Sequence, residues 1–378
     1  MSKSSCVKRA ATWRRRLVAA DLRPLLAIAL VAFCIAHSLH YLEVAPLRRA
    51  DDLLYDMRVR WFAGAAVDER IAIVDIDERS LAELGRWPWH RARLADLVER
   101  IFADYGALLL GLDVILAEPD ESSGLPSLEA LARGPLRQNP AFQAALAELR
   151  PALDYDGRLA AVISRYPVVL GFHFSAGAGA AQSGELPAAL RVEAAELAAG
   201  LTRWPGYGAN LPRLQQAAMA GGFLGAPVDS DGVTRRGWLL ASHDGRVYAA
   251  LALAMAQVLL GHPELQLRFA EAPPGRSGGG PLVALELASA RGPLRVPVDQ
   301  QAAVLLPFRA SAGRFAYHSA ADVLAGRLPA DSLRGRVVLL GTSAAGLLDQ
   351  RVTPVSEAFP GVEVHANLLA GLLDGALV

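Results

Sequence analysis

Apolar residues recur along this chain with two different periods, and the stretch from Ile71 to Asp113 contains both. Residues 71–77 form a short run of mostly β-branched apolar residues that ends in acids, which is typical of a buried strand. Between 91 and 105 the apolar residues return at every third or fourth position, which predicts a helix with one apolar face. A second apolar run at 107–116 predicts another buried strand. Strand, helix and strand at this spacing predict a βαβ unit with two adjacent, parallel strands and a right-handed crossover.

The segment between the first strand and the helix carries turn signals. Ser80 is expected to cap a short helix that ends at Gly85. Pro88 fixes its own φ angle and keeps Trp87 out of the helical region, so residues 86–89 are expected to form a rigid loop.

The same patterns place the remaining elements. Apolar runs at 221–225 and 233–242 flank a turn-forming segment, Asp229–Gly232, and predict a β-hairpin. His173 alternates with apolar residues and is expected to be a hydrogen-bonded core residue. The sequence therefore predicts an α/β fold, with a mostly parallel sheet flanked by helices and a β-hairpin-rich middle insertion. The other expected elements are helices at 48–62, 142–149, 157–165, 248–260 and 364–373, and strands at 167–174, 282–287, 294–298, 303–307 and 336–341.

The first 42 residues have the pattern of a membrane anchor. Residues 1–21 are a basic tail, and residues 22–42 contain a continuous apolar core that at about 1.5 Å per residue spans roughly 30 Å, the thickness of a bilayer core. Because the tail carries the larger positive charge, we expect it to be cytoplasmic, with a transmembrane helix at 22–42 and an extracytoplasmic domain at 43–378. A cleaved signal peptide is the alternative, although its apolar core is usually shorter.

Composition limits the chemistry of the folded region. The 378 residues are 53% hydrophobic, and 38 basic residues balance 38 acidic ones, with no basic stripe that would indicate a nucleic-acid partner. The lysines, Lys3 and Lys8, lie in the basic tail, so no lysine is available for catalysis in the domain. Cys6 and Cys34 also precede the domain, which therefore has no disulfide. The glycine-rich segments lack a phosphate-binding lysine and the dinucleotide fingerprint is missing, so we expect no cofactor.

Several stretches resemble one known family, the type-two CHASE domain. They are "IAIVDIDERSLAELGRWPWHRARLADLVERI" followed by "GALLLGLDVILAEPD", the middle stretch "GFLGAPVDSDGVTRRGWLL", and the closing stretch "FAYHSAADVLAGRLPADSLRGRVVLLGTSAAGLLDQRVTPVSEAFPGVEVHANLLAGLLDG". The resemblance covers roughly residues 48–375. It implies a bacterial sensory domain without enzyme activity, placed in the periplasm behind an inner-membrane anchor. It also implies, in a longer gene product, an output module such as a nucleotide cyclase, diguanylate cyclase or histidine kinase, and a homodimer, because cyclase outputs generally work in pairs.

Candidate site residues lie where the predicted parallel strands end, because open α/β sheets bind their ligands at that edge. We expect a single crevice there that binds a small polar or cationic effector, with a tryptophan near its rim. The acids of this region, which include Asp75, Glu118 and Asp120, could also hold a divalent cation or simply pair with arginines; we expect no metal site. The ligand-binding candidates are Asp77, Trp87, Trp89, Asp113, Thr342, Ser343, Asp349 and His365.

The sequence leaves two other functions open. The stretch Gly341–Ala345 nearly matches the G-x-S-x-G elbow of hydrolases, and Asp349 and His365 follow Ser343 in the hydrolase order. However, Ala345 replaces the second glycine, and these groups are far closer in sequence than that fold places them. The remaining alternative is a dimerisation scaffold without a ligand. His365 is alternatively a local helix cap, and the two tryptophans alternatively pack over the sheet edge.

Overall fold

The computed structural model describes residues 22–38, 45–62, 67–177, 179–192, 200–270, 280–289, 292–309, 313–347 and 349–377. The chain divides into two compact units, Met1–Arg58 and Val59–Val378. Helix α2 (Leu22–Ser38) belongs to the first unit, and α3 (Ala45–Phe62) crosses the boundary in sequence. The predicted tail at 1–21 and the last residues of the predicted span, 39–42, lie outside the described residues. Within the described part, no helix is both long and apolar enough to span a bilayer.

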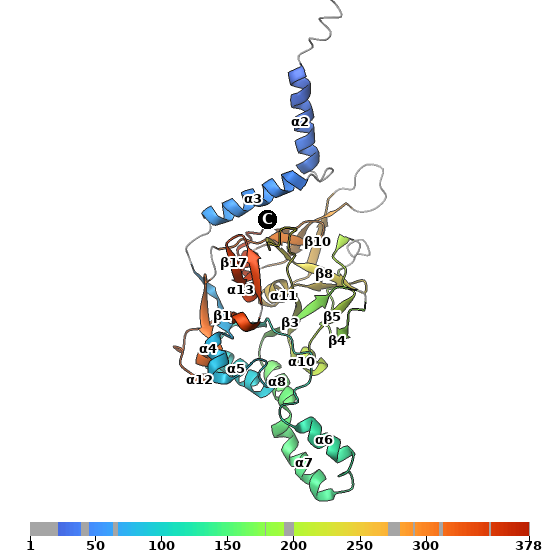
Figure 1. Cartoon of the computed structure of the whole chain (residues 1–378), viewed down its shortest axis with the longest axis vertical. Helices are drawn as coiled ribbons and strands as arrows, with labels where there is room; N and C mark the ends of the chain where they lie inside the picture. Colours follow the sequence, from blue (N-terminus) through green and yellow to red (C-terminus); the bar gives the residue numbers. More distant parts are fainter. Residues whose placement is uncertain are drawn as a thin grey trace, which may run out of the picture. The chain divides into compact units, whose positions relative to one another are not determined.

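The second unit is organised around an eight-stranded, parallel-rich sheet (Figure 1). Its order is β14-β1-β15-β2-β3-β5-β4, and β6 also pairs with β3. Six strands are mutually parallel, whereas β5 runs antiparallel to β3. The strands are β1 (Asp68–Asp75), β2 (Leu109–Leu112), β3 (Val168–Ser175), β4 (Gln182–Ser183), β5 (Gly206–Gly208), β6 (Ala220–Leu224), β14 (Phe315–Ser319) and β15 (Val337–Gly341).

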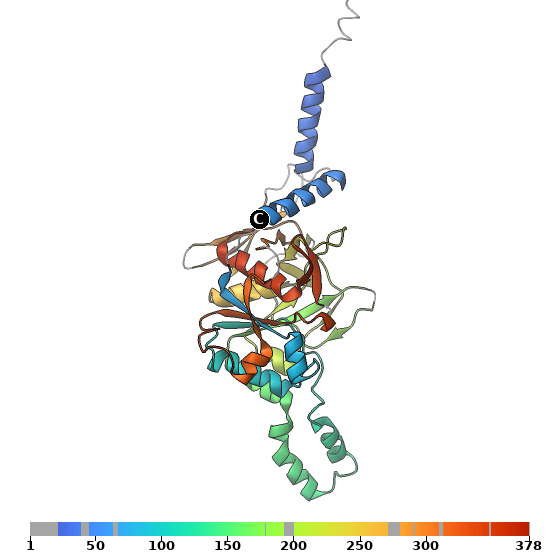
Figure 2. The same ribbon diagram turned by 60° about the vertical axis from the view of Figure 1, so that its left-hand side comes forward.

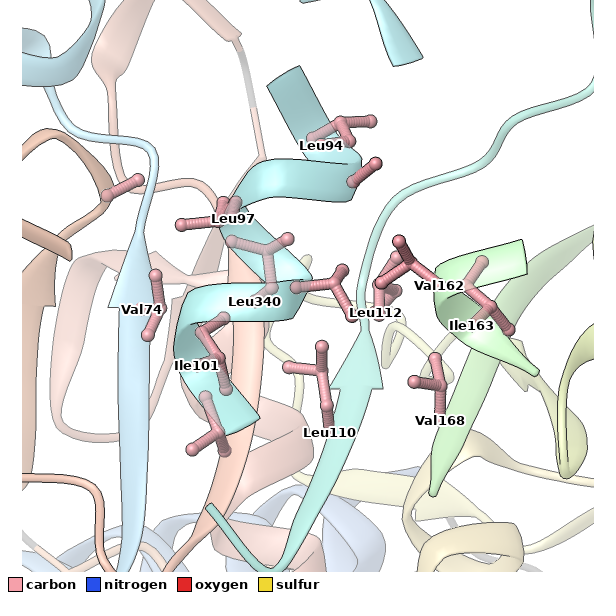
Figure 3. Packing of buried hydrophobic residues seen from close by; sticks show 14 of the residues in the cluster. Val74, Leu94, Leu97, Ile101, Leu110, Leu112, Val162, Ile163, Val168 and Leu340 are labelled. Carbon is pink, nitrogen blue, oxygen red and sulfur yellow. The ribbon is translucent and has the colours of Figure 1, made fainter. Parts of the chain in front are cut away.

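The parallel strands are buried on both faces, which explains their continuous apolar runs. One face is covered by α5 (Arg91–Ala103), α8 (Tyr155–Ile163) and α12 (Ala320–Ala325). Figure 3 shows side chains of α5 and α8 pointing toward Val74, Leu110, Leu112, Val168 and Leu340 of four neighbouring strands. The opposite face is covered by α11 (Leu251–Leu259) and α13 (Gly361–Asp374). The mixed α/β fold with a parallel-rich sheet is therefore confirmed.

Glycines let the helices of the second face approach the strands closely. A Cβ atom on Gly111 would lie 2.4 Å from the Met255 sulfur of α11. On Gly222 it would lie 2.5 Å from the backbone of Leu251, and on Gly341 it would lie 2.6 Å from Val362 of α13. The absence of side chains at these positions fixes the spacing between the sheet and both helices.

The sequence prediction was wrong on two strand pairings. The strands predicted at 71–77 and 107–116 are parallel, but β15 lies between them, so they are not adjacent. The hairpin predicted from 221–225 and 233–242 does not form. Instead β6 pairs with β3, β7 (Arg236–Trp238) pairs with β13 (Ala303–Leu305), and β8 (Leu240–His243) forms a hairpin with β9 (Arg246–Ala249). The turn at 229–232 is present, but each flanking strand finds a partner distant in sequence.

Two element boundaries also differ from the prediction. Strand β1 ends at Asp75, and Asp77 rather than Ser80 caps the next helix, α4 (Glu78–Leu84), because its carboxylate accepts a hydrogen bond from the Ser80 amide at 2.7 Å. Residues 118–139, a stretch rich in proline, glycine and serine, contain a short helix. This helix, α6 (Leu125–Arg133), and α7 (Pro140–Leu153) form an arm that projects from the sheet-bearing body (Figures 1 and 2).

The remaining described elements are mostly short antiparallel strands. They are the strands β10 (Leu265–Phe269), β11 (Leu282–Leu287) and β12 (Leu294–Pro297), which form one small sheet, the hairpin β16 (Gln350–Thr353) with β17 (Ser356–Pro360), the helix α10 (Pro212–Ala217) and the 3₁₀ turn Ala345–Leu347.

An ionic cluster joins the start of β1 to the end of α13. Arg70 lies 2.7 Å from a carboxylate oxygen of Asp68 and 2.7 Å from one of Asp374. Arg309 pairs with the same two acids. The Asp68 side chain is almost fully buried, and its two arginine partners hold the pKa of its carboxyl below the usual range even though burial alone would raise it. Two distant parts of the chain are thereby held together.

Candidate functional site

A pocket of about 580 Å³ opens at the carboxyl edge of the parallel sheet. Its lining comes from the segments that follow β2, β6 and β15, from the loop before α5, and from β16 and the first turns of α13. This is the edge at which open α/β sheets bind ligands. The structure brings five of the eight predicted candidates to this pocket: Trp87, Asp113, Thr342, Asp349 and His365.

Asp113 and His365 form a buried pair in the pocket. Asp113 directly follows β2, where its amide donates to the Leu340 carbonyl at 2.8 Å, and His365 lies on α13. His365 Nε2 is 3.9 Å from Asp113 Oδ1, and the two side chains are only 9% and 6% exposed. Asp113 Oδ2 and His365 Nδ1 have no hydrogen-bond partner among the described residues. Most buried polar atoms are hydrogen-bonded, so two unpartnered atoms in one buried pair are an exception that requires an explanation.

Burial shifts the charge states of both groups. It raises the pKa of Asp113 to about 7, an effect that Arg351 opposes. It lowers the pKa of His365 to about 4, against the opposing influence of Asp349. The imidazole is therefore neutral at pH 7, and the Asp113 carboxyl is close to the midpoint of its titration.

Asp349 and Arg351 place further charge beside this pair. Arg351 Nη2 is 3.8 Å from Asp349 Oδ1, and the arginine side chain is 43% exposed. Burial, followed by the negative charge of Asp113, raises the pKa of the Asp349 carboxyl. Gly361 makes room for this carboxylate, because a Cβ atom there would lie 2.4 Å from its oxygens.

The walls of the pocket are largely apolar. They include Trp87, Val114, Leu224 and Leu347. Arg91 also lines the pocket: its Nη2 donates to the Glu118 carbonyl at 3.1 Å, and its Nε, which lies 3.6 Å from Asp156 Oδ1, has no hydrogen-bond partner among the described residues. A site of this kind, apolar with a few convergent polar groups, is typical of small-molecule binding.

Three predicted candidates do not line the pocket. Asp77 caps α4 and accepts a hydrogen bond from the Ser319 hydroxyl at 2.9 Å. Trp89 is only 2% exposed, and its indole N–H donates to the Gly85 carbonyl at 2.9 Å. Ser343 donates to Asp75 from both its amide, at 2.8 Å, and its hydroxyl. Asp77 therefore caps a helix, Trp89 packs in the core, and Ser343 links the end of β15 to the end of β1.

The Ser343 contacts bear directly on the hydrolase alternative. The Ser343 hydroxyl donates to a carboxylate, whereas His365 faces Asp113. In the part of the chain that the structure describes, no hydrogen bond joins Ser343 to His365. The nucleophile and the base of a catalytic triad would have to lie within hydrogen-bond reach of each other.

Sequence reasoning missed three basic lining residues, Arg91, His173 and Arg351. No sequence pattern singles out Arg91 or Arg351 as a site residue, although Arg351 is two residues from Asp349. The prediction that His173 is a core residue was wrong: its side chain is exposed and lines the pocket, because β3 continues beyond its parallel neighbour β2. The described residues contain no group of three or more histidine, cysteine, aspartate or glutamate side chains placed to hold a metal ion.

Comparison with protein families decides the relationship that the motifs suggested. The model of the CHASE2 domain matches residues 27–378, nearly the whole chain. This chain belongs to the CHASE2 domain family. CHASE2 domains are extracellular sensory domains of signalling proteins, so the resemblance in the sequence is confirmed. Comparison of the chain with curated proteins and with solved structures gave no match.

Proposed function

We propose that this CHASE2 domain senses a small ligand in the pocket at the carboxyl edge of its sheet. The observation that carries the proposal is the buried pair of unpartnered atoms, Asp113 Oδ2 and His365 Nδ1, in a pocket of about 580 Å³. An unsatisfied buried polar atom costs free energy, and a ligand that hydrogen-bonds to it recovers that cost. A ligand-binding role therefore explains a feature that would otherwise only destabilise the fold.

A thermal-shift screen on the full chain in detergent micelles tests this proposal. A metabolite that binds the folded state raises the midpoint of thermal unfolding in proportion to the logarithm of its concentration. Ala226→Trp should abolish the shift because Ala226 lines the pocket, whereas Val228→Trp, two residues away and 55% exposed, should preserve it. A shift that survives in Ala226→Trp would place the ligand elsewhere.

The proposed location is the inner membrane, with the sensory domain, residues 43–378, in the periplasm. Helix α2 supports a bilayer contact because its large apolar side chains are exposed. Alkaline phosphatase fused after Gly64 or after Leu377 should be active, and a fluorescent cytoplasmic reporter at the same positions should be dark. The opposite pattern would reverse the topology. The exposed large apolar side chains of α2 are Leu25, Leu26, Ile28, Leu30, Val31, Phe33 and Ile35.

The signal is proposed to reach an output module, a nucleotide cyclase, diguanylate cyclase or kinase, through a homodimer. Cys34 is exposed on α2 and gives a first probe of this dimer. Mild oxidation of membranes should cross-link the wild-type chain at Cys34, or else cysteine variants at one helical stripe between residues 25 and 36. Uniform absence of cross-links along that stretch would favour a monomer.

A further inference from the structure

The two unpartnered atoms of the Asp113–His365 pair are both available as hydrogen-bond acceptors when Asp113 is ionised. When Asp113 is ionised, its Oδ1 lies 3.9 Å from His365 Nε2 and favours the neutral tautomer that carries its hydrogen on Nε2. The unpartnered Nδ1 then presents a lone pair. Asp113 Oδ2, when ionised, presents another. The complementary ligand group is therefore a donor with at least two N–H or O–H bonds.

The charges around this point favour a cation. The ion-pair partner of Asp113 is His365, which burial keeps neutral, so among the described residues no cation is in contact with the ionised aspartate, although the charge of Arg351 acts on it from nearby. Asp349 adds a second carboxyl nearby. The negative charge of Asp113 raises the pKa of Asp349, so ionising both carboxyls costs additional free energy. A carboxylate or phosphate ligand would meet both acids at this point, whereas a protonated nitrogen would stabilise them.

The apolar lining residues indicate that the remainder of the ligand is apolar. Trp87, Leu224 and Leu347 are apolar and belong to different segments of the lining. An indole also stabilises a nearby cation through its π face. An organic ammonium compound with an apolar body matches this combination of an acidic, acceptor-rich point and apolar walls, and a bare metal ion does not match it.

We propose that the pocket binds a small organic ammonium compound, with its protonated nitrogen between Asp113 Oδ2 and His365 Nδ1 and its apolar body against Trp87 and Leu224. This inference rests on the proposed function of the pocket as the ligand site. A plain amine and an amino acid share this chemistry. In an amino acid, the carboxylate would face Arg351, whose side chain is 43% exposed beside Asp349.

Isothermal titration of the full chain in micelles at pH 8 tests the proposal with three probes of one shape: phenethylamine, 2-phenylethanol and 3-phenylpropionate. Phenethylamine should bind most tightly, and Asp113→Asn should weaken its binding at least about tenfold, the loss expected for a charge-assisted hydrogen bond. The control Asp104→Asn removes an acid at the end of α5 that is 52% exposed, so it should change the affinity by less than about twofold.

A second comparison separates the two sources of the ammonium group. If the natural ligand is an amino acid, L-phenylalanine should bind more tightly than phenethylamine, and Arg351→Gln should remove only that advantage. If it is a plain amine, the order should reverse. Either order supports the ammonium proposal.

The overturning results are distinct from failure of the proposed function. Equal or tighter binding of 2-phenylethanol or 3-phenylpropionate, wild-type affinity for phenethylamine in Asp113→Asn, or no binding of phenethylamine or L-phenylalanine at millimolar concentration would each overturn the ammonium proposal. The pocket would remain the ligand site if Ala226→Trp blocked whatever else bound. Ligand binding that Ala226→Trp leaves intact would instead contradict the proposed function.

Discussion

Asp113 and His365 approach within 3.9 Å of each other from the end of β2 and from α13, and burial pushes their pKa values in opposite directions, to about 7 and about 4. Each group is held closer to its neutral form than it would be in water. The stability of the fold should therefore depend on pH through two terms of opposite sign, and single substitutions can separate them.

Asp113→Asn should stabilise the chain above pH 7. The folded protein binds the Asp113 proton more tightly than the unfolded chain does, so wild-type stability falls as pH rises from about 4 to about 7 and stays low above that. The penalty is on the order of 4 kcal/mol. Urea unfolding should give similar free energies for both proteins near pH 4 and a more stable variant at pH 8. Equal stability at pH 8 would mean that Asp113 ionises in the fold without cost.

His365→Gln should show the opposite dependence. The unfolded chain protonates this histidine below about pH 6.5, but the folded protein does so only near pH 4, so wild-type stability falls as pH decreases through that window. Relative to wild type, the variant should gain on the order of 3 kcal/mol between pH 7 and pH 4. The difference between the two unfolding curves isolates this term, and a difference that does not change with pH would contradict it.

Ser343→Ala should cost stability and leave ligand binding unchanged. Asp75 is buried, and it accepts hydrogen bonds from both the hydroxyl and the amide of Ser343; the variant removes the first. The expected loss is about 1–3 kcal/mol in urea unfolding. Ser164→Ala is a suitable control, because that hydroxyl is exposed and bonds only locally. Loss of binding in Ser343→Ala with unchanged stability would return Ser343 to the site.

Two glycine substitutions should differ in cost although both glycines face α11. In Gly222→Ala the new Cβ would meet the backbone of Leu251 at 2.5 Å, which cannot move without moving the helix. In Gly111→Ala it would meet the end of the flexible Met255 side chain. We expect a loss of about 1–3 kcal/mol or more for Gly222→Ala and a smaller one for Gly111→Ala by thermal unfolding. The reverse order would mean that α11 shifts easily.

The sheet could be predicted where the local pattern and the fold agree. Strands β1 and β15 are continuous apolar runs because both faces are covered by helices, and that pattern is visible in the sequence. The partners of β6 and β7 could not be predicted. Their nearest turn, at 229–232, is local, whereas the pairing that forms depends on β3 and β13, which are distant in sequence.

The site was predictable to the extent that it depends on topology. Parallel strands bring their ends to one edge, so Asp113, Thr342 and Asp349 were expected together, and the structure places all three at the pocket. Side-chain direction is not set by that rule. Trp89 turns into the core instead of toward the edge, and Arg351 lies on a short hairpin strand without the apolar run that would have predicted it.

The ionic cluster of Asp68, Arg70, Arg309 and Asp374 gives the domain a mechanical property. A pull on the start of β1 reaches the end of α13 through two guanidinium groups, without passing through the long stretch of chain between them. A force applied to either end is therefore shared by both ends. A ligand that displaces α13 would therefore move the end of α13 and the start of β1 together and would not increase the distance between them.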